Sequence, residues 1–247
     1  MKNEFDYLND VVVDLLRYED VVVNEGKREY AEVDGVIYGR YAVKTHVVTD
    51  KDRLDVIAKK YIKPKLAPGD VVFISEKMVA CTQGRAIHLD KIRPRKLAVY
   101  LSSKVYKNPG GIGLAMPETM EMALRECGVW RILLAAAVHC VGRLFGQRGW
   151  FYIMAGRKAA SIDGPCHYTL PPYNQYVVLW PKEPAKAAKK VAEILGVPVL
   201  IVDINDLGGE ILGSSERVDK KLYCEILRDN PLGQSDQCTP CGIIRKK

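Results

Sequence analysis

The apolar positions of this chain follow two different periods, which alternate along the sequence. Short runs of β-branched and aliphatic residues predict extended strands at 41–48, 71–75, 79–82, 150–155, 176–180, 198–202 and 242–245. Apolar residues at helical spacing predict helices at 50–61, 96–105, 117–127, 131–141, 184–195 and 219–228. Strands that alternate with helices indicate an α/β fold, here of the mixed α+β kind.

Turn residues support several of these boundaries. Pro117 stands at the start of one predicted helix and is followed by Glu118, as expected for the first turn of a helix. Gly196 directly follows the predicted helix 184–195, where a glycine can adopt the left-handed conformation that ends a helix.

The pattern also suggests how the chain is divided. Residues 1–37 alternate acidic residues with short aliphatic runs, which predicts a peripheral N-terminal appendage, a helix followed by an extended arm. Residues 38–247 form the predicted main domain, with a boundary between two subdomains near 106–150.

Composition places the chain among ordinary globular proteins. Of its 247 residues, 48% are hydrophobic and 27% are charged, and the net charge is +7. The basic clusters are consistent with a solvated face, and also with attraction of an anionic small molecule or nucleic acid. None of them is interleaved with aromatic residues in a stacking pattern, so nucleic acid is the weaker interpretation.

The sequence predicts a cytoplasmic protein without a membrane partner. The most apolar run, 129–145, is interrupted by Arg131, His139 and Arg143, so it is typical of a buried helix rather than a membrane span. The N-terminal residues lack the basic and apolar regions of a signal peptide.

The cysteines point to the same compartment. Seven widely scattered cysteines, an odd number, favour reduced thiols over a disulfide framework. Cys238 and Cys241 form a lone C-x-x-C, for which packing is favoured over a metal or redox role because no second pair accompanies it.

The strongest candidate for a working site follows the buried strand 198–202. Asp203, Asn205 and Asp206 come directly after this strand, and in open α/β sheets ligands collect beyond the carboxyl ends of strands. Carboxylate oxygens there could hold Mg²⁺ or Mn²⁺, and Gly208 and Gly209 could let the backbone approach a phosphate. The alternative is an ordinary turn at 206–208 that Asp203 caps.

Three further polar segments could contribute to the same chemistry. Asp163, in a turn-rich loop, could supply another oxygen ligand, or it could begin a type I turn. Lys77 and Arg85 could contact phosphate or carboxylate, with a solvated hairpin as the alternative. The third segment is the polar loop 233–240. The four histidines have no partner nearby in sequence, and His139 is interpreted as a core residue.

Taken together, four of these segments resemble the coenzyme F420-0:γ-glutamyl ligase family. The stretch 76–85 is similar to the family's Q-K-I-V-S-K-A-E-G-R, and 155–163 stands where the family has A-G-x-D-x-S-N. The stretch 201–206 resembles a strand that ends in I-S-D-T, and 233–240 resembles G-Q-A-D-E-G-x-P. Order and spacing agree over residues 41–246.

The resemblance implies a ligase-like fold of two intertwined subdomains and an interwoven homodimer. It also implies GTP- or ATP-dependent addition of L-glutamate, or a similar amino acid, to F420-0 or another carboxylate through an acyl phosphate, assisted by Mg²⁺ or Mn²⁺. The residues assigned by position are Lys77 and Arg85 for catalysis, Gly84, Gly208, Gly209, Gln234 and Ser235 for nucleotide or phosphate, and Asp203, Asp206 and Asp163 for metal.

The chain departs from the family pattern at several charged positions. Gln83 and Gln237 stand where the family has glutamate, Lys158 where it has aspartate, and Cys81 where it has lysine. Fewer carboxylates predict weaker binding of a divalent cation. A second hypothesis is therefore a non-catalytic binding or regulatory protein that recognises an anionic small molecule on the same fold.

Overall fold

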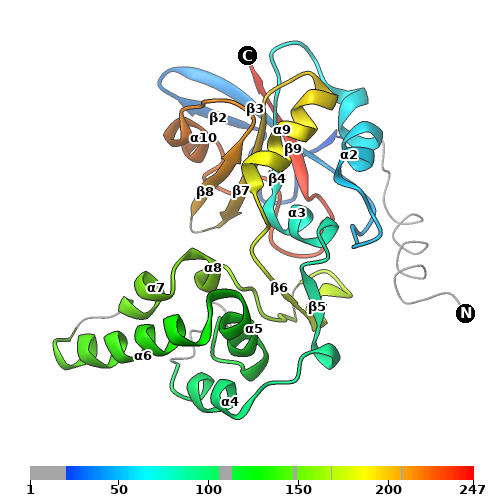
Figure 1. Ribbon diagram of the computed structural model, residues 1–247. Helices are drawn as coiled ribbons and strands as arrows, with labels where there is room; N and C mark the ends of the chain where they lie inside the picture. The colour runs from blue at the N-terminus through cyan, green and yellow to red at the C-terminus, as the bar shows by residue number, and fades with distance from the viewer. Residues whose placement is uncertain (1–20, 106–112, 147–148, 168, 207) are drawn as a thin grey trace, which may run out of the picture. The chain divides into compact units, whose positions relative to one another are not determined.

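The computed structural model describes residues 21–105, 113–146, 149–167, 169–206 and 208–247 (Figure 1). The chain divides into two compact units. Unit 1 comprises residues 1–84, 168–172 and 181–247, and unit 2 comprises residues 85–167 and 173–180. Unit 2 is thus inserted, in sequence, between the two main parts of unit 1.

Unit 1 is built on a mixed sheet. Within the described residues the sheet has seven strands: β1 (Val21–Val22), β2 (Tyr30–Val33), β3 (Val36–Val43), β4 (Val71–Ser75), β7 (Val199–Asn205), β8 (Gly208–Ser214) and β9 (Cys241–Lys246). Their order is β1-β3-β9-β4-β7-β8, and β2 also pairs with β3. Only β4 and β7 run parallel; the other pairs are antiparallel.

Helices cover both faces of this sheet (Figure 1). On one face, α9 (Pro184–Leu195) packs against β7 and β8. Gly213 of β8 makes this approach possible, because a Cβ there would lie 2.4 Å from the backbone nitrogen of Ala185. On the other face, Ile226 of α10 (Lys220–Ile226) packs into an apolar cluster with Leu200 and Val202.

Unit 1 has four further helical elements among the described residues. Helix α2 (Leu54–Ile57) runs on into a π-helical turn (Ala58–Ile62) and a 3₁₀ turn (Lys63–Lys65). Helix α3 (Glu76–Thr82) follows β4 without a loop, because Ser75 acts as the N-cap and its side chain accepts a hydrogen bond from the Lys77 N–H.

Unit 2 is mainly helical. Its helices are α4 (Lys96–Ser102), α5 (Pro117–Cys127), α6 (Val129–Leu144), α7 (Trp150–Ala155) and α8 (Arg157–Ala160). A two-stranded sheet, β5 (Ala86–His88) with β6 (Tyr176–Val178), and 3₁₀ turns at Leu89–Lys91 and Tyr173–Gln175 complete it. Buried residues from these helices, among them Met120, Ile132 and Phe151, form one apolar core.

Most of the predicted helices and strands are confirmed within a few residues. Helix α9 has the predicted bounds, and Gly196 ends it with a φ of +77°. Helix α10 starts one residue later than predicted, because the Asp219 side chain caps it. The last strand is longer than predicted, and so is β7, which extends to Asn205.

Two predicted strands are wrong, because both segments are helical. Residues 150–155 form α7, in which Phe151 and Ala155, four residues apart, are buried against the core of unit 2. Residues 79–82 belong to α3, whose start the Ser75 cap fixes. In both segments the aromatic and β-branched residues favoured a strand, and tertiary packing overrides that local preference.

The strand predicted at 41–48 is placed too late in the sequence. Strand β3 spans Val36–Val43, and residues 44–49 have no regular secondary structure. Residues 21–37 contribute β1 and β2 to the sheet. The helix predicted within the first residues lies outside the described part of the chain.

A membrane-spanning helix needs about 20 mostly apolar residues. Within the described residues, no single helix is long and apolar enough to cross a bilayer. Helices α5 and α6 would meet the criteria only as a pair, and they are bent by 116° at Gly128.

Candidate functional site

The parallel pair β4–β7 brings two carboxyl ends to the same edge of the sheet in unit 1. Ser75, the last residue of β4, pairs with Val202, so the start of α3 is level with Asp203. Parallel strands that end side by side are the usual place for a ligand in an α/β sheet. The residues that follow Val202, which the sequence analysis picked out as candidates, therefore lie at this edge of the sheet.

Two other segments reach this edge. The Ser75 N–H donates to the Pro240 carbonyl over 2.9 Å, so the polar loop 233–240 ends beside the start of α3. The Thr45 N–H donates to the Cys238 carbonyl over 3.1 Å, which adds the residues after β3. Segments far apart in sequence thus meet where β4 and β7 end.

A hairpin carries the predicted acidic cluster. Strands β7 and β8 are antiparallel, with Asp203 opposite Glu210 and Asn205 opposite Gly208. Directly opposed residues have Cβ atoms about 5 Å apart, and residues two apart share a face. Asp203, Asn205 and Glu210 therefore share one face of the hairpin, and all three are half-buried.

Glu210 was not among the predicted ligands. No local signal specifies it: Gly208 and Gly209 belong to β8, opposite Asn205 and Ile204, and the register of the hairpin places Glu210 beside Asp203. Gly209 is required by packing: a Cβ there would lie 2.4 Å from the Ile204 side chain. This contact explains Gly209 without a phosphate, so its phosphate-binding role stays a prediction.

Asp206 is engaged elsewhere. Its carboxylate accepts a hydrogen bond of 2.6 Å from the ammonium group of Lys27, which also donates to the Asp229 carbonyl. Asp206 thereby ties the turn of the hairpin to the segment between β1 and β2. The structure does not place it on the face that Asp203 and Glu210 share.

Lys77 lies in the first turn of α3, level with Asp203, and its side chain is exposed. Glu76 beside it is buried, with 7% of its surface exposed. A lysine in the first turn of a helix that ends a strand can meet an anionic group at this edge. This position agrees with the predicted role of Lys77 without testing it.

Gln83 and Gly84 end the same helix. Gly84 adopts a φ of +65°, and its N–H donates to the Cys81 carbonyl, which is the arrangement that terminates a helix. The Gln83 side chain donates to the Lys182 carbonyl and accepts from the Lys182 N–H, over 2.9 and 2.7 Å. A carboxylate cannot do both, so the glutamine that replaces the family's glutamate has a structural role here.

Arg85 lies in unit 2, where it is buried with 8% of its surface exposed. Its Nε donates to the Trp180 carbonyl and its Nη2 to Glu126, both over 2.5 Å. Part of its guanidinium is therefore committed to unit 2. Its predicted role toward phosphate stays a prediction.

Asp163 also lies in unit 2, whereas the β7–β8 hairpin belongs to unit 1. Its backbone exchanges hydrogen bonds of 3.0 and 2.9 Å with Val178, in an isolated β-bridge. The three predicted metal ligands are thus divided between the two units. Lys158, in α8 of unit 2, is exposed.

The loop 233–240 is held by its own side chains. Gln237 accepts a hydrogen bond from the Ser235 N–H over 2.8 Å, and it lies so close to Gly233 that a Cβ there would be 2.6 Å away. Gln234 and Ser235 are exposed. They are accessible to a ligand, as the predicted nucleotide role requires, and that role is untested.

The face of the hairpin supplies oxygen ligands that a divalent cation accepts. In the described part of the chain no group of three histidine, cysteine, aspartate or glutamate side chains is arranged as a metal centre. Asp203, Glu210 and the amide of Asn205 nevertheless supply two carboxylates and a carbonyl oxygen on one face, which are ligands that Mg²⁺ and Mn²⁺ accept. These donor atoms suit a divalent cation, although two carboxylates give the site one negative charge fewer than three would.

Sequence reasoning also missed a side-chain network around His46. Its Nε2 lies 2.9 Å from Asp52, and its Nδ1 lies 2.8 Å from the Tyr61 hydroxyl. Burial acts to raise the pKa of Asp52, but the hydrogen bonds from His46 and Thr49 outweigh it and lower that pKa. The network ties the segment after β3 to the π-helical turn. No local sequence pattern predicts that His46 pairs with Tyr61, fifteen residues away.

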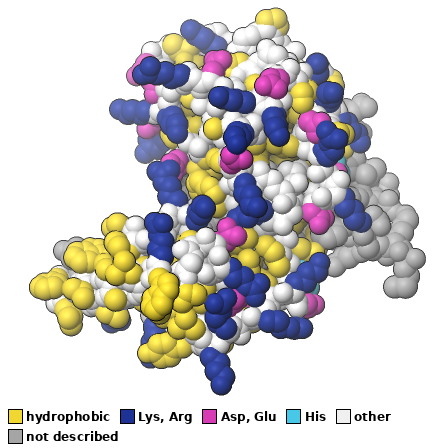
Figure 2. Space-filling view, viewed as in Figure 1, with side chains coloured by type: hydrophobic (Ala, Val, Ile, Leu, Met, Phe, Trp, Pro, Cys, Tyr) yellow, Lys and Arg dark blue, Asp and Glu magenta, His cyan; other side chains and the backbone are white. Residues whose placement is uncertain are grey.

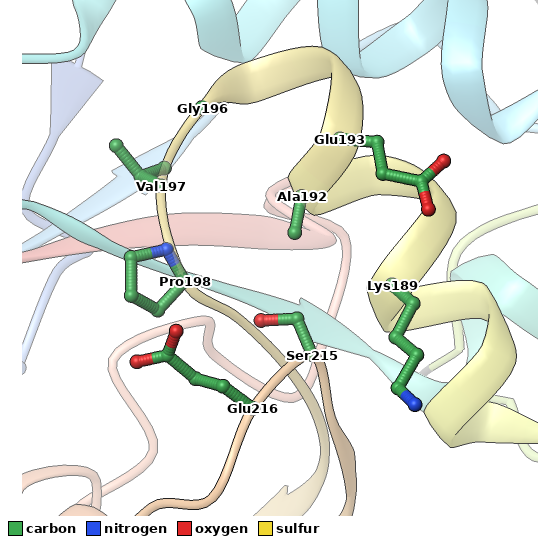
Figure 3. Close-up of a pocket in the computed structure, with 8 residues that line it drawn as sticks. All are labelled: Lys189, Ala192, Glu193, Gly196, Val197, Pro198, Ser215 and Glu216. Carbon is green, nitrogen blue, oxygen red and sulfur yellow. The ribbon is translucent and has the colours of Figure 1, made fainter.

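A hollow of about 400 Å³ opens at the other end of β7 (Figure 3). It is lined by Lys189, Ala192, Glu193, Gly196, Val197, Pro198, Ser215 and Glu216. Asp203 lies four residues beyond Val199, which is about 13 Å along an extended strand. This hollow is therefore distinct from the candidate site.

Comparison with known families identifies the chain. The family model of F420-0:gamma-glutamyl ligases matches residues 42–206, about two thirds of the sequence. The chain belongs to the F420-0:gamma-glutamyl ligase family. The matched region includes α3, Gly84, Arg85, Asp163 and β7 through Asp206, and it ends before Glu210 and the loop 233–240. None of the curated proteins compared with the chain matches it.

Membership in this family implies a ligase and suggests nucleotide-dependent glutamyl transfer. The family generally uses GTP and divalent cations. The resemblance seen in the sequence is thus confirmed at the level of the family, and the roles of individual residues are not decided by it.

Proposed function

We propose that the chain is a GTP- or ATP-dependent amide-bond ligase that adds L-glutamate, or a similar amino acid, to F420-0 or another acidic acceptor. The observation that carries this proposal is the face shared by Asp203, Asn205 and Glu210 at the carboxyl edge of the β4–β7 pair. The family match covers β7, which carries Asp203 and Asn205, and ends before Glu210 of β8.

The proposed reaction has two steps. A carboxylate oxygen of the acceptor attacks the γ-phosphorus of the nucleotide, so that an acyl phosphate forms and nucleoside diphosphate leaves. The neutral amine of glutamate then attacks the acyl carbon, the amide bond forms, phosphate leaves, and the nitrogen gives up one of its two protons. Hydrolysis of the nucleotide thereby supplies the free energy for the amide.

Named residues take separate parts in this scheme. Asp203 and Glu210, assisted by the amide of Asn205, hold a divalent cation, Mg²⁺ or Mn²⁺, whose charge offsets the negative charge of the phosphates. Lys77, at the start of α3, contacts the anionic substrate or phosphate at the same edge. Gln234 and Ser235 lie in the exposed loop that ends beside α3 and contact the nucleotide.

The test is direct. The purified full-length chain is incubated with GTP or ATP, Mg²⁺ or Mn²⁺, L-glutamate and F420-0, and the glutamylated product and inorganic phosphate are measured. Nucleotide binding is followed separately by isothermal titration. Product that depends on all four components supports the ligase.

Two results would count against it. Binding of neither nucleotide at any metal concentration would reject the proposal. Nucleotide binding without product, with F420-0 and with a panel of other carboxylate acceptors, would favour the alternative of a binding or regulatory protein.

The quaternary structure that the family resemblance implies is also a proposal. We expect two copies to form an interwoven homodimer, which sedimentation velocity of the full-length chain can test. A monomer at all concentrations would contradict it.

A further inference from the structure

The loop 233–240 has an exposed tip and a buried base. Gln234 and Ser235 are exposed, whereas Thr239 is buried, with 4% of its surface exposed. The Thr239 hydroxyl donates to the Leu232 carbonyl over 2.7 Å, so it joins the two ends of the loop. A loop whose ends are joined in this way is a compact unit that presents its tip to solvent.

Asn24, in the turn between β1 and β2, holds this base from a distant part of the chain. It is buried, and its Nδ2 donates to the Thr239 hydroxyl and to the Pro231 carbonyl, both over 2.9 Å. These partners lie 215 and 207 positions away in sequence. A buried polar network whose members are hydrogen-bonded rigidifies the segments that it joins. We call Asn24, Thr239 and the carbonyls of Pro231 and Leu232 the loop clamp.

The end of the loop has a backbone conformation that requires support from its surroundings. Cys238 has a φ of +53°, in the left-handed region that residues other than glycine rarely adopt. Its carbonyl accepts a hydrogen bond from the Thr45 N–H over 3.1 Å, and its thiol donates to the Thr45 carbonyl over 3.2 Å. Such conformations persist where the surrounding structure fixes them, and they cluster at sites that hold ligands. Tertiary contacts, rather than local preference, therefore shape this loop.

The same turn also contacts the hairpin that carries the acidic face. The Lys27 N–H donates to the Asn24 carbonyl over 3.0 Å, which closes the turn, and the Lys27 ammonium group lies 2.6 Å from the Asp206 carboxylate. A single short turn thus contacts both the base of the loop and the hairpin. It therefore fixes the loop relative to the hairpin whose face Asp203 and Glu210 share.

Charge alone does not mark where a nucleotide would bind on unit 1. Figure 2 shows the lysine and arginine side chains of this unit spread over the visible face and interspersed with aspartates and glutamates. A phosphate attracted by such a diffuse charge still has to be oriented by donors that are held in place. Gln234 and Ser235, at the tip of the clamped loop, can supply such donors.

We propose that Asn24 and Thr239 are positioning residues, which hold the loop 233–240 so that its exposed tip meets the phosphates of the nucleotide. This inference rests on the proposed function and adds to it two residues outside the matched region 42–206. The loop contacts the nucleotide before and during the reaction, so loss of the clamp should raise the Kd and KM for nucleotide and leave kcat unchanged. A mere loss of folded protein would instead lower the apparent kcat and leave KM unchanged.

The experiment compares two substitutions of Thr239. Thr239→Val keeps the shape but removes the hydroxyl, so Asn24 and the Leu232 carbonyl both lose a partner, whereas Thr239→Ser retains the hydroxyl. With GTP and Mg²⁺, the Kd from isothermal titration and the KM from product formation should rise about tenfold in Thr239→Val. Thr239→Ser should restore most of the affinity, and Asn24→Ala should resemble Thr239→Val. The KM for L-glutamate should stay at the parent value in all three variants.

Cys238 reports the position of the loop when no nucleotide is present. Its thiol is buried, so iodoacetamide should modify it slowly in the parent chain. Modification should be faster in Thr239→Val and Asn24→Ala, because the loop then opens more often. Saturating GTP with Mg²⁺ should slow the modification in the parent and in both variants. Mass spectrometry of the alkylated peptides measures these rates.

The matched control is Thr119, in α5 of unit 2. It is fully buried, and its hydroxyl donates to the Met116 carbonyl over 2.9 Å. Thr119→Val therefore removes the same chemical group as Thr239→Val, from a part of the protein that does not hold the loop. It should lower the urea midpoint by a comparable amount but leave nucleotide affinity and the modification of Cys238 unchanged.

Two results would overturn this inference alone. One is a parent chain that binds GTP while Thr239→Val and Asn24→Ala bind it equally well. The other is modification of Cys238 that is no faster in these variants than in Thr119→Val, because the clamp would then not hold the loop. A parent chain that binds neither GTP nor ATP would instead reject the proposed function itself, and the nucleotide role of the clamp with it.

Discussion

Asp203 and Glu210 stand directly opposite each other on the antiparallel strands β7 and β8, at the edge where β4 and β7 end. The side chains of opposed residues lie on one face, so a single cation can be reached by both carboxylates. Asp206, only three residues from Asp203, is instead held by Lys27. The neighbour of Asp203 in space is therefore Glu210, although Asp206 is closer to it in sequence.

This difference yields the first prediction. Asp203→Asn and Glu210→Gln should each weaken Mn²⁺ binding on the order of tenfold or more, because each removes one of two carboxylates. Asp206→Asn should leave Mn²⁺ affinity unchanged and cost at most about 1 kcal/mol of stability, since it breaks one exposed ion pair. Isothermal titration with Mn²⁺ and urea unfolding measure the two effects. Equal losses of Mn²⁺ affinity in all three variants would contradict the assignment.

A second prediction concerns the two glutamines that replace family glutamates. Gln83→Glu should destabilise the protein by about 1 kcal/mol at neutral pH, because a carboxylate cannot donate to the Lys182 carbonyl. Gln237→Glu should be tolerated, because the Ser235 N–H needs only an acceptor. Urea unfolding of both variants provides the comparison.

The pH dependence of Gln83→Glu gives an independent check. The Lys182 carbonyl disfavours the charged form, so we expect the pKa of the new glutamate to be higher in the folded state than in the unfolded state. The cost should therefore shrink as the pH falls through the raised folded pKa towards about 4, the pKa of an unfolded glutamate, because a protonated glutamate can donate again. A cost that does not change with pH would show that the lost donor is not its cause.

The third prediction concerns acid stability. Folding lowers the pKa of Asp52 from its ordinary value of 3.8: burial raises it, and the hydrogen bonds from His46 and Thr49 together lower it by more. Ionised Asp52 therefore stabilises the folded state above that pH, and this contribution is lost as the pH falls through the folded pKa. The free energy of unfolding should depend less on pH below about 4 in Asp52→Asn than in the parent chain. Identical slopes would contradict a stabilising role for the carboxylate.

The fourth prediction concerns the cysteines. Burial raises the pKa of the Cys238 thiol to about 12, and Cys241 is buried beside it with a pKa raised by the same cause. Because the thiolate is the reactive form, both should resist iodoacetamide in the native state, and exposed Cys140 should be modified first. Mass spectrometry of partially alkylated protein gives the order. Early modification of Cys238 would show that the loop 233–240 opens in solution.

The amino-acid pattern was a good guide wherever one face of an element packs on a core. Helix α9 and strand β4 have the predicted bounds because their apolar positions match their periods and turn residues mark their ends. The pattern failed for α7, because Trp150, Phe151, Tyr152 and Ile153 favour a strand locally, and only packing beside α6 makes them a helix.

The sequence analysis located the strand end that carries the candidate site, but it did not identify all the side chains that share its face. Asp203 was found because it follows a buried run, whereas Glu210 depends on the register of a hairpin, which local patterns do not specify. The ion pair of Asp206 with Lys27 joins residues 179 positions apart. Such partners are determined by tertiary structure, so the patterns of a single sequence do not reveal them.

The placement of β9 has a consequence for how the chain acquires its fold during synthesis. Strand β9 lies between β3 and β4, although it is made after every other strand of the sheet. Until residues 241–246 emerge from the ribosome, β3 and β4 have open edges, and pairing must wait for a partner distant in sequence. Unit 2, whose residues all precede 181, is complete in the nascent chain well before then. We therefore expect unit 2 to fold first, and unit 1 to complete its sheet only after β9 has been synthesised.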